Sequence, residues 1–273
     1  MEKSKLKSFI KRTLTALVLV PVVVGCIFLG NPFILLLAML GATLMSWEWS
    51  EMVPNSRKPF YTAVYMFCSI FTLISMPAIT HLHLPILIII AFVLTVALIL
   101  SFVKSKGEKN RGLLLLGIPY ITIGVGSVLA IYDYAGPFLL LWFMVLVWGV
   151  DIGGYIFGCS IKGPKLAPKI SPNKTWAGLI GGVALAVGLS YCIVSFFSDS
   201  WAINSYYVYM AIILGVIAQV GDLIESYIKR RLGLKDSSNL IPGHGGIFDR
   251  IDGLIFAAPV AYLMLRLLPY FIR

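Results

Sequence analysis

The stretch "KRRLGLKDSSNLIPGHGGIFDRIDG", residues 229–253, separates two strongly apolar runs. It gathers basic residues, aspartates, a histidine and five glycines in one place. The apolar runs on either side, residues 205–228 and 247–271, are each long enough for a transmembrane helix, because about 20 apolar residues span a hydrocarbon core of about 30 Å. We therefore expect a charged, glycine-rich connection between two membrane helices.

The whole chain has the composition of an integral membrane protein. Of its 273 residues, 59% are hydrophobic and only 12% are charged, whereas soluble domains carry about 25% charged residues. Seven earlier segments also have the length of a span: residues 13–30, 33–52, 60–79, 84–103, 112–132, 137–158 and 176–197. The sequence thus predicts an all-α integral membrane protein with about nine transmembrane helices.

The basic residues alternate along the predicted connections. The N-terminal tail and every second connection carry 19 of the 22 Lys and Arg residues, while connections such as "THLHL", "DYAG" and "SDSWAIN" carry none. By the positive-inside rule, the N-terminus is cytoplasmic and the C-terminus is outside. The formal charge of +10 is therefore interpreted as a topology signal, and no nucleic-acid partner is expected.

Polar content divides this single membrane domain into two regions. The spans within residues 1–103 hold few ionisable groups, and this region is predicted to form a scaffold, whereas residues 104–273 carry the predicted site. Glu48 is an exception in the scaffold and lies between Trp47 and Trp49. Because tryptophan is typical of the membrane interface, we interpret Glu48 as an interface anchor rather than a functional residue.

Carboxylates from three predicted helices gather at the cytoplasmic side. Asp151 lies near the end of residues 137–158, Asp222 near the end of residues 205–228, and Asp249 and Asp252 at the start of the last helix. Ionisable groups in membrane helices are costly and by default indicate a functional site. We expect a shared polar cavity that opens to the cytoplasm.

One of these helices carries a polar stripe. Asp222, Glu225, Ser226 and Lys229 follow one another at i, i+3, i+4 and i+7, so they share one helix face. Such a stripe should face protein or water instead of lipid. It is equally well explained by a structural salt bridge between Lys229 and one of the two carboxylates.

The glycine-rich turn has the composition of a phosphate site. The backbone N–H groups of Gly245 and Gly246 can line a concavity for phosphate oxygens, and His244 between the glycines is a candidate for acid–base chemistry or phosphate binding. Basic side chains such as Arg230 and Lys235 bind phosphate. Carboxylates hold Mg²⁺ through oxygen. Together these features predict a site for a nucleoside triphosphate with a divalent metal.

A second anion site is predicted at "SPNKTWAGLIGG", residues 171–182. Ser171 before a proline is a candidate cap or turn residue, and Lys174 and Thr175 follow at the start of a predicted helix. A helix N-terminus of this composition binds anions readily. The alternative is an ordinary capped helix start.

At this point the residues resemble a known family, the phosphatidate cytidylyltransferases or CDP-diacylglycerol synthases. Residues 226–252 are similar to that family's signature, and "DIGGYIFG" and "SPNKTWAG" upstream also resemble it. The first hundred residues resemble the family in hydropathy alone. The fixed positions of the signature are all filled here: Ser226, Lys229, Arg230, Lys235, Asp236, His244, Gly245, Gly246, Asp249, Arg250 and Asp252.

The resemblance implies transfer of the cytidylyl group of CTP to phosphatidate, dependent on Mg²⁺, at the cytoplasmic face of a bacterial-type inner membrane. It assigns the metal to Asp222 and Asp249, with Asp252 and Asp151 as further candidates. A second, monovalent cation and a homodimer are left open. The implied catalytic residues are Asp222, Asp249, Lys229, Arg230 and His244. The implied substrate-binding residues are Ser171, Lys174, Thr175, Ser226, Lys235, Gly245, Gly246 and Arg250.

One position departs from the family pattern. The family usually has Glu where this chain has Ala177, so a catalytically silent paralogue stays an alternative, as does another CTP-using membrane lipid enzyme of the polyprenol kinase kind. A transporter is disfavoured because the charges lie at one face of the predicted bundle instead of its midplane. Acyl-chain preference, the choice between CTP and dCTP, and oligomeric state are not encoded in these patterns.

Overall fold

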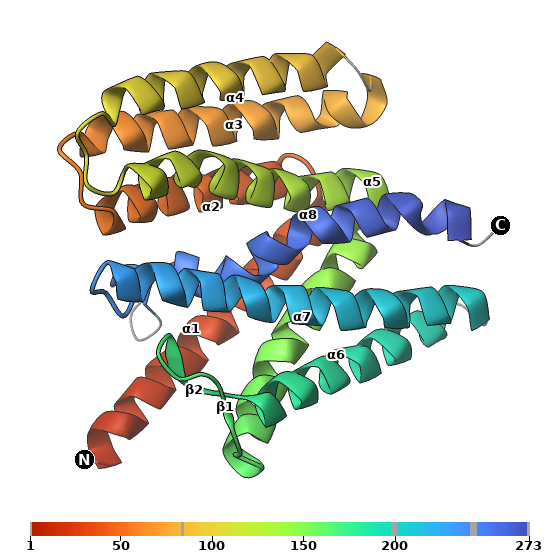
Figure 1. Ribbon diagram of the computed structural model, residues 1–273. Coiled ribbons are helices and arrows are strands. Elements are labelled where there is room, and N and C mark those ends of the chain that lie inside the picture. Colours follow the sequence, from red (N-terminus) through yellow and green to blue (C-terminus); the bar gives the residue numbers. More distant parts are fainter. Residues whose placement is uncertain (1, 83–84, 198–200, 241–244, 272–273) are drawn as a thin grey trace. The chain divides into compact units, whose positions relative to one another are not determined.

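The computed structural model describes residues 2–82, 85–197, 201–240 and 245–271, which are almost entirely helical (Figure 1). The helices are α1 (Glu2–Leu29), α2 (Phe33–Met52), α3 (Lys58–Leu82), α4 (Pro85–Lys104), α5 (Arg111–Ser160), α6 (Trp176–Phe197), α7 (Trp201–Arg231) and α8 (Phe248–Phe271). Two short strands, β1 (Lys165–Ala167) and β2 (Ser171–Thr175), lie between α5 and α6. The helical fold is confirmed, and the strands are an addition that the all-α prediction missed.

Helix α5 covers two of the predicted spans because it is interrupted. Gly136 has φ 81° and ψ 178°, a conformation outside the helical region that glycine adopts without a Cβ penalty. Pro137 follows and has no backbone N–H to continue the helical ladder. Residues 111–135 and 137–160 are therefore two helical segments.

Within the described residues, four helices are long and apolar enough to cross a membrane. They are α2, α5, α6 and the part of α7 that runs from Ile203 to Arg231. Large apolar side chains are exposed along them, among them Leu36, Ile180 and Phe196. Such apolar surface suits contact with lipid. The number of nine spans and their orientation stay predictions.

The chain forms two compact units. The first comprises Met1–Pro137 and Leu232–Ile251, and the second comprises Phe138–Arg231 and Asp252–Arg273. The predicted division at residue 103 concerned polar content and stays a prediction.

The first unit packs around Trp49, which is fully buried. Helix α2 contacts α1 and α3, and α3 contacts α4. The indole N–H of Trp49 donates to the carbonyl of Leu113 at 3.1 Å, and the hydroxyl of Tyr65 donates to the carbonyl of Leu114 at 2.7 Å. The Trp49 ring also packs on Tyr120 and Phe248, with centroid distances of 5.5 and 5.3 Å. Helices α2 and α3 are thereby joined to the first half of α5.

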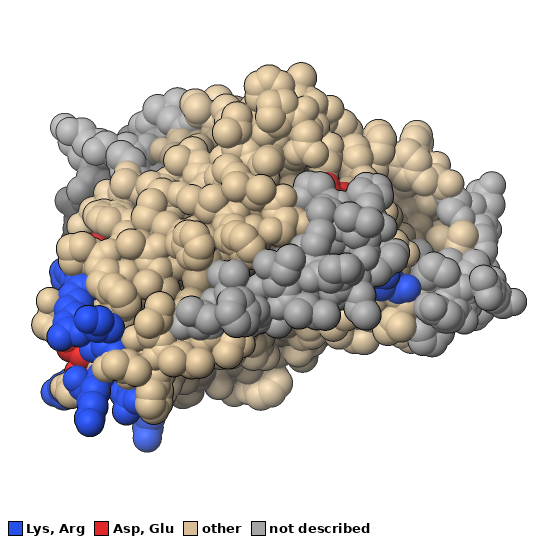
Figure 2. All heavy atoms as spheres, turned by 90° about the horizontal axis from the view of Figure 1, so that it is seen from above, with Lys and Arg blue, Asp and Glu red and all other residues tan. Residues whose placement is uncertain are grey.

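Two basic connections of the first unit also lie together. The guanidinium of Arg57 donates to the carbonyl of Lys104 at 3.4 Å, and Glu108 accepts from both the hydroxyl and the backbone N–H of Ser56. These hydrogen bonds hold the pKa of Glu108 below its usual value. Figure 2 shows Lys and Arg side chains gathered at one edge of the face in view. The α2–α3 and α4–α5 connections thus lie at one end of this unit, as the alternation of charge predicts.

Glycines bring α5 and α6 close together in the second unit. A Cβ at Gly153 would lie 2.8 Å from the Cα of Gly182, and one at Gly178 would lie 2.8 Å from the carbonyl oxygen of Gly154. Small residues allow membrane helices to approach at this distance and gain van der Waals contact. Helix α6 in turn packs against α7.

The hairpin ahead of α6 corrects the predicted cap of this helix, whereas its start at Trp176 agrees with the prediction. Strands β1 and β2 are antiparallel and pair Lys165 with Thr175. Ser171, a candidate cap, lies in β2, because a residue before proline is driven to extended backbone. The cap is instead Thr175, whose hydroxyl oxygen accepts from the backbone N–H of Gly178 at 3.0 Å. This arrangement places Lys174 in β2, directly before the cap residue Thr175.

Candidate functional site

Three carboxylates meet in the second unit. Asp222 and Glu225 come from α7 and Asp252 comes from α8, and one ligand oxygen of each lies within 4.8 Å of the others. The i, i+3 spacing on α7 places the first two on one face. The structure therefore brings Glu225 into the cluster, although we did not predict it as a metal ligand from the sequence.

Two glycines explain why α7 and α8 approach so closely at this level. A Cβ at Gly221 would lie 2.5 Å from the Cβ of Phe256 and 3.2 Å from the carbonyl oxygen of Asp252. A Cβ at Gly253 would lie 3.0 Å from the carbonyl oxygen of Ala218. Because each glycine lies next to an acidic residue, the missing side chains let the two helices bring their carboxylates together.

Two lysines partly neutralise the cluster. The ammonium of Lys174 forms an ion pair with Oδ2 of Asp222, and the ammonium of Lys229 lies 2.6 Å from Oε2 of Glu225. The Ser226 hydroxyl donates to Oδ1 of Asp222 at 3.3 Å. The side chains of Glu225 and Lys229 are only 2% and 10% exposed. The alternative of a salt bridge on the α7 stripe is thus confirmed, with Glu225 as the partner.

The donor set of this cluster suits a hard divalent cation. Carboxylate oxygens are the ligands that Mg²⁺ and Ca²⁺ take in proteins, and three converge here on one small volume. Asp151 lies exposed on α5 and outside the close group, although its charge acts on Asp252. The cluster can bind a metal through Asp222, Glu225 and Asp252.

The hairpin is tied to the same end of α7. The Arg230 guanidinium donates to the carbonyl of Ile170 at 3.3 Å, and Lys174 on β2 reaches Asp222. Of these two predicted phosphate-binding residues, Lys174 thus lies at the carboxylates and Arg230 lies at the hairpin. Thr175 is buried and occupied as a helix cap, so the alternative of a capped helix start holds for this residue.

Asp249, the other predicted metal ligand, lies in the first unit at the first turn of α8. Its carboxylate accepts from the backbone N–H of Gly246 at 2.8 Å and from that of Ser237 at 3.0 and 3.1 Å. A negative charge is favourable at a helix N-terminus. A metal site shared by Asp249 and Asp222 stays a prediction, because these residues belong to different compact units.

The remaining residues of the glycine-rich connection are only partly described. Gly245 has φ 89°, in the left-handed region that favours glycine. Lys235 and Arg250 are exposed. His244 lies outside the described residues, so its predicted role stays a prediction.

Glu48 corrects our interpretation of the scaffold. Its side chain is fully buried, so an anchor at the membrane interface is the wrong reading. The carboxylate accepts hydrogen bonds from the hydroxyls of Ser237 and Ser238 and from the backbone N–H groups of Ile247 and Phe248. A carboxylate within an apolar helix is costly and by default suggests a functional role. In the sequence, the two flanking tryptophans favoured the interface anchor over that role.

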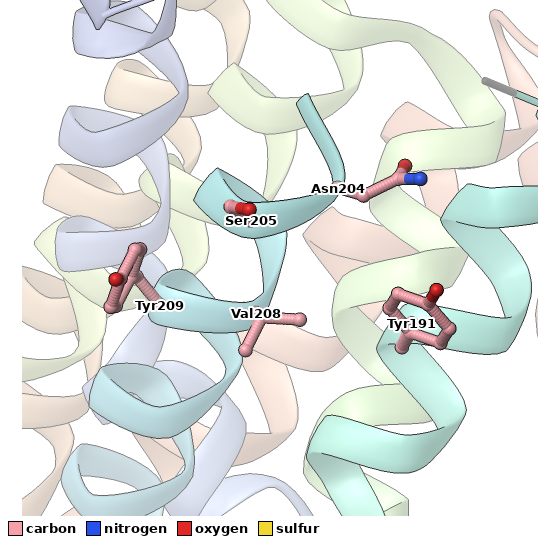
Figure 3. Close-up of a pocket in the computed structure, with 5 residues that line it drawn as sticks. All are labelled: Tyr191, Asn204, Ser205, Val208 and Tyr209. Carbon is pink, nitrogen blue, oxygen red and sulfur yellow. The ribbon is translucent and has the colours of Figure 1, made fainter. Parts of the chain in front are cut away.

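A pocket of about 220 Å³ lies elsewhere in the second unit (Figure 3). Tyr191 of α6 and four residues of α7 line it: Asn204, Ser205, Val208 and Tyr209. Asn204 and Asp222 are eighteen residues apart on α7, or about 27 Å at 1.5 Å per residue. The pocket is therefore separate from the acidic cluster.

Comparison with known proteins identifies relatives over nearly the whole chain. The family described as "Cytidylyltransferase family" matches residues 10–268. A phosphatidate cytidylyltransferase of Haemophilus influenzae is 36% identical over 277 residues, covering 91% of this chain and 96% of that protein. Those of Pseudomonas aeruginosa and Brucella suis are 33% and 32% identical and each cover 92% of this chain, with 94% and 91% of their own lengths matched. The likeness thus includes the N-terminal hundred residues, where the sequence motifs were absent.

Proposed function

The chain belongs to the cytidylyltransferase family, and on this basis we propose that it transfers the cytidylyl group of CTP to phosphatidate, giving CDP-diacylglycerol and pyrophosphate. The observation that carries the proposal is the cluster of Asp222, Glu225 and Asp252 with its two lysines. Relatives matched over more than nine-tenths of their length bear the name of this activity. Carboxylates that can hold a divalent cation, with lysines beside them, suit phosphate chemistry.

The reaction requires no strong general base. An oxygen of the phosphatidate phosphate attacks the α-phosphorus of CTP and forms the new P–O bond, while the bond between the α-phosphorus and its bridging oxygen to the β-phosphate breaks. Pyrophosphate leaves with that bonding pair. Because a phosphate monoester carries a charge of about −1.5 to −2 at pH 7, the nucleophile is already anionic. Catalysis then consists of alignment and neutralisation of charge on the phosphates.

The residues of the second unit suit these tasks. When bound at Asp222, Glu225 and Asp252, Mg²⁺ would supply positive charge to phosphate oxygens. The Lys174 and Lys229 ammonium groups, now paired with carboxylates, would exchange those partners for phosphate oxygens of the substrates. Arg230 supplies a planar donor for a further phosphate. Asp249 and Asp151 are proposed as additional metal ligands on the basis of the sequence resemblance.

Other proposed contacts follow the family signature. The residues proposed to hold phosphates of CTP, pyrophosphate or lipid are Ser226, Lys235, His244, Gly245, Gly246 and Arg250. Ser171, in the upstream stretch that also resembles the family, would complete the nucleotide site, whereas Thr175 is the cap of α6. We place this site at the cytoplasmic face, with the N-terminus inside, on the alternation of basic connections. The site must also open toward lipid, because moving an acyl chain into water costs about 0.8 kcal/mol per CH₂.

The test is an assay of the purified protein in detergent with phosphatidate, labelled CTP and Mg²⁺. We expect label in the lipid extract and an equal amount of pyrophosphate, both dependent on Mg²⁺ and on Asp222. Competition with polyprenol and other lipid alcohols separates this activity from that of another CTP-using lipid enzyme. CTP binding without transfer to any lipid, by folded protein, would refute the proposal and favour a silent paralogue with Ala177 as the relevant difference.

A further inference from the structure

Glu48 links the two sides of the connection between α7 and α8, and every contact involved lies within the first unit. Its Oε1 accepts from the Ser238 hydroxyl at 2.6 Å and from the Ile247 N–H at 2.9 Å. Its Oε2 accepts from the Ser237 hydroxyl at 3.3 Å and from the Phe248 N–H at 2.8 Å. Each oxygen therefore bridges one hydroxyl from the first side and one backbone N–H from the second.

The arrangement satisfies donors that the fold leaves open. The first N–H groups of a helix have no acceptor within that helix, and the Phe248 N–H is one of them, at the start of α8. A carboxylate accepts about four hydrogen bonds, which is the number that Glu48 receives here. Its negative charge also suits a helix N-terminus. Glu48 thus caps α8 from a helix that is distant in sequence.

Gly246 allows the carboxylate to come this close. A Cβ at Gly246 would lie 2.6 and 2.7 Å from the two oxygens of Glu48 and would also overlap the Ser237 hydroxyl. Any side chain at this position would displace Glu48 or the serine. One glycine of the family signature therefore has a packing role beside Glu48.

Ser237 connects Glu48 to a proposed metal ligand. The hydroxyl of Ser237 donates to Glu48, while its backbone N–H donates to the carboxylate of Asp249. Asp249 also accepts from Gly246 N–H. We propose that Glu48 is a positioning residue of the reaction, which sets the conformation of residues 237–240 and 245–248 on the two sides of the connection and the orientation of Asp249. It contacts no substrate itself, and the inference rests on the proposed function.

The test compares Glu48→Gln with Glu51→Gln. The glutamine has nearly the same shape, but its amide nitrogen cannot accept a hydrogen bond, so one backbone N–H and one hydroxyl lose their acceptor. Glu51 is on the same helix, its side chain is 42% exposed and it pairs with Lys58 at 2.7 Å. We expect Glu48→Gln to lower kcat/KM for CTP at least tenfold, with KM for phosphatidate within twofold of wild type. Glu51→Gln should keep both within twofold.

The double variant Ser237→Ala/Ser238→Ala removes the two hydroxyl donors and leaves Glu48 in place. It should lower kcat/KM for CTP in the wild-type background and have a smaller effect in the Glu48→Gln background, because contacting residues are not additive. This variant also provides the test if Glu48→Gln does not fold. The inference would be overturned if the double serine variant lowered kcat/KM by the same factor in both backgrounds, or if folded Glu48→Gln had unchanged kcat/KM. A loss of activity that is merely proportional to the loss of folded protein would overturn it as well.

Failure of the proposed function is recognised separately, because wild-type protein would then transfer no label. In that case hydrogen exchange decides whether Glu48 sets the conformation of residues 237–240 and 245–248. Their amides should exchange at least tenfold faster in Glu48→Gln than in Glu51→Gln. Equal protection in the two variants would refute the role of Glu48 without reference to catalysis.

Discussion

Replacing Gly182 by alanine tests the close approach of α5 and α6. The new Cβ would lie 2.5 Å from the carbonyl oxygen of Val150 and 3.1 Å from the backbone nitrogen of Gly154. Both atoms belong to the backbone of α5, so no side-chain rotation can relieve the overlap. The helices must separate, and Lys174, which precedes the cap residue Thr175 of α6, would move with α6.

The magnitude follows from two opposing effects. Inserting a methyl group into a well-packed interface costs about 1–3 kcal/mol, whereas Gly→Ala within a helix gains about 0.8–1.0 kcal/mol from backbone propensity. Gly188 on the same helix serves as the control, because a Cβ there has no neighbour within 4 Å. Gly188→Ala therefore has the gain in helix propensity without the cost of overpacking. Gly182→Ala should therefore be less stable than Gly188→Ala by about 1–3 kcal/mol.

The assay is the unfolding midpoint of both variants in the same detergent, followed by tryptophan fluorescence. Each kcal/mol corresponds to about 2–4 °C for chains of roughly this size, so Gly182→Ala should unfold at least about 2 °C below Gly188→Ala. Its transfer of label from CTP should also fall. A midpoint at or above that of Gly188→Ala would show that the α5–α6 contact is not close-packed and would refute the argument.

Three further predictions concern charge. Asp222→Asn and Asp249→Asn should each abolish transfer of label from CTP while the protein still fractionates with membranes, and near-normal activity in both would contradict the metal assignment. Lys229→Met should destabilise the protein by about 3–5 kcal/mol, because it removes the ammonium that pairs with the buried Glu225 carboxylate. Adding Glu225→Gln should restore most of the unfolding midpoint. The hydrogen bonds from Ser56 lower the pKa of Glu108 in the folded protein. The contact therefore stabilises the protein fully at pH values above the ordinary glutamate pKa of about 4.3, and this stabilisation disappears as the pH falls through the lower pKa of the folded state. Glu108→Gln should remove that part of the pH dependence of the midpoint, and an unchanged pH profile would count against the contact.

The sequence alone determined where most helices lie and which residues of α7 share a face. A backbone in lipid must satisfy its own hydrogen bonds, so each long apolar run becomes a helix, and α2 and α6 begin and end where the apolar pattern predicts. The i, i+3 spacing of Asp222 and Glu225 is likewise a local property of any helix. The family resemblance added the reaction and most of the proposed site.

Only the tertiary structure decided which polar groups meet. Asp252 joins the α7 carboxylates because Gly221 and Gly253 let α8 approach, and Thr175 replaces Ser171 as the cap of α6 because the preceding residues form a hairpin. Glu48 binds groups that lie 189 to 200 residues further along the chain. No local periodicity encodes contacts of this kind. They depend on how closely two helices can pack. The side chains of both helices set that distance, so it follows only from the tertiary structure.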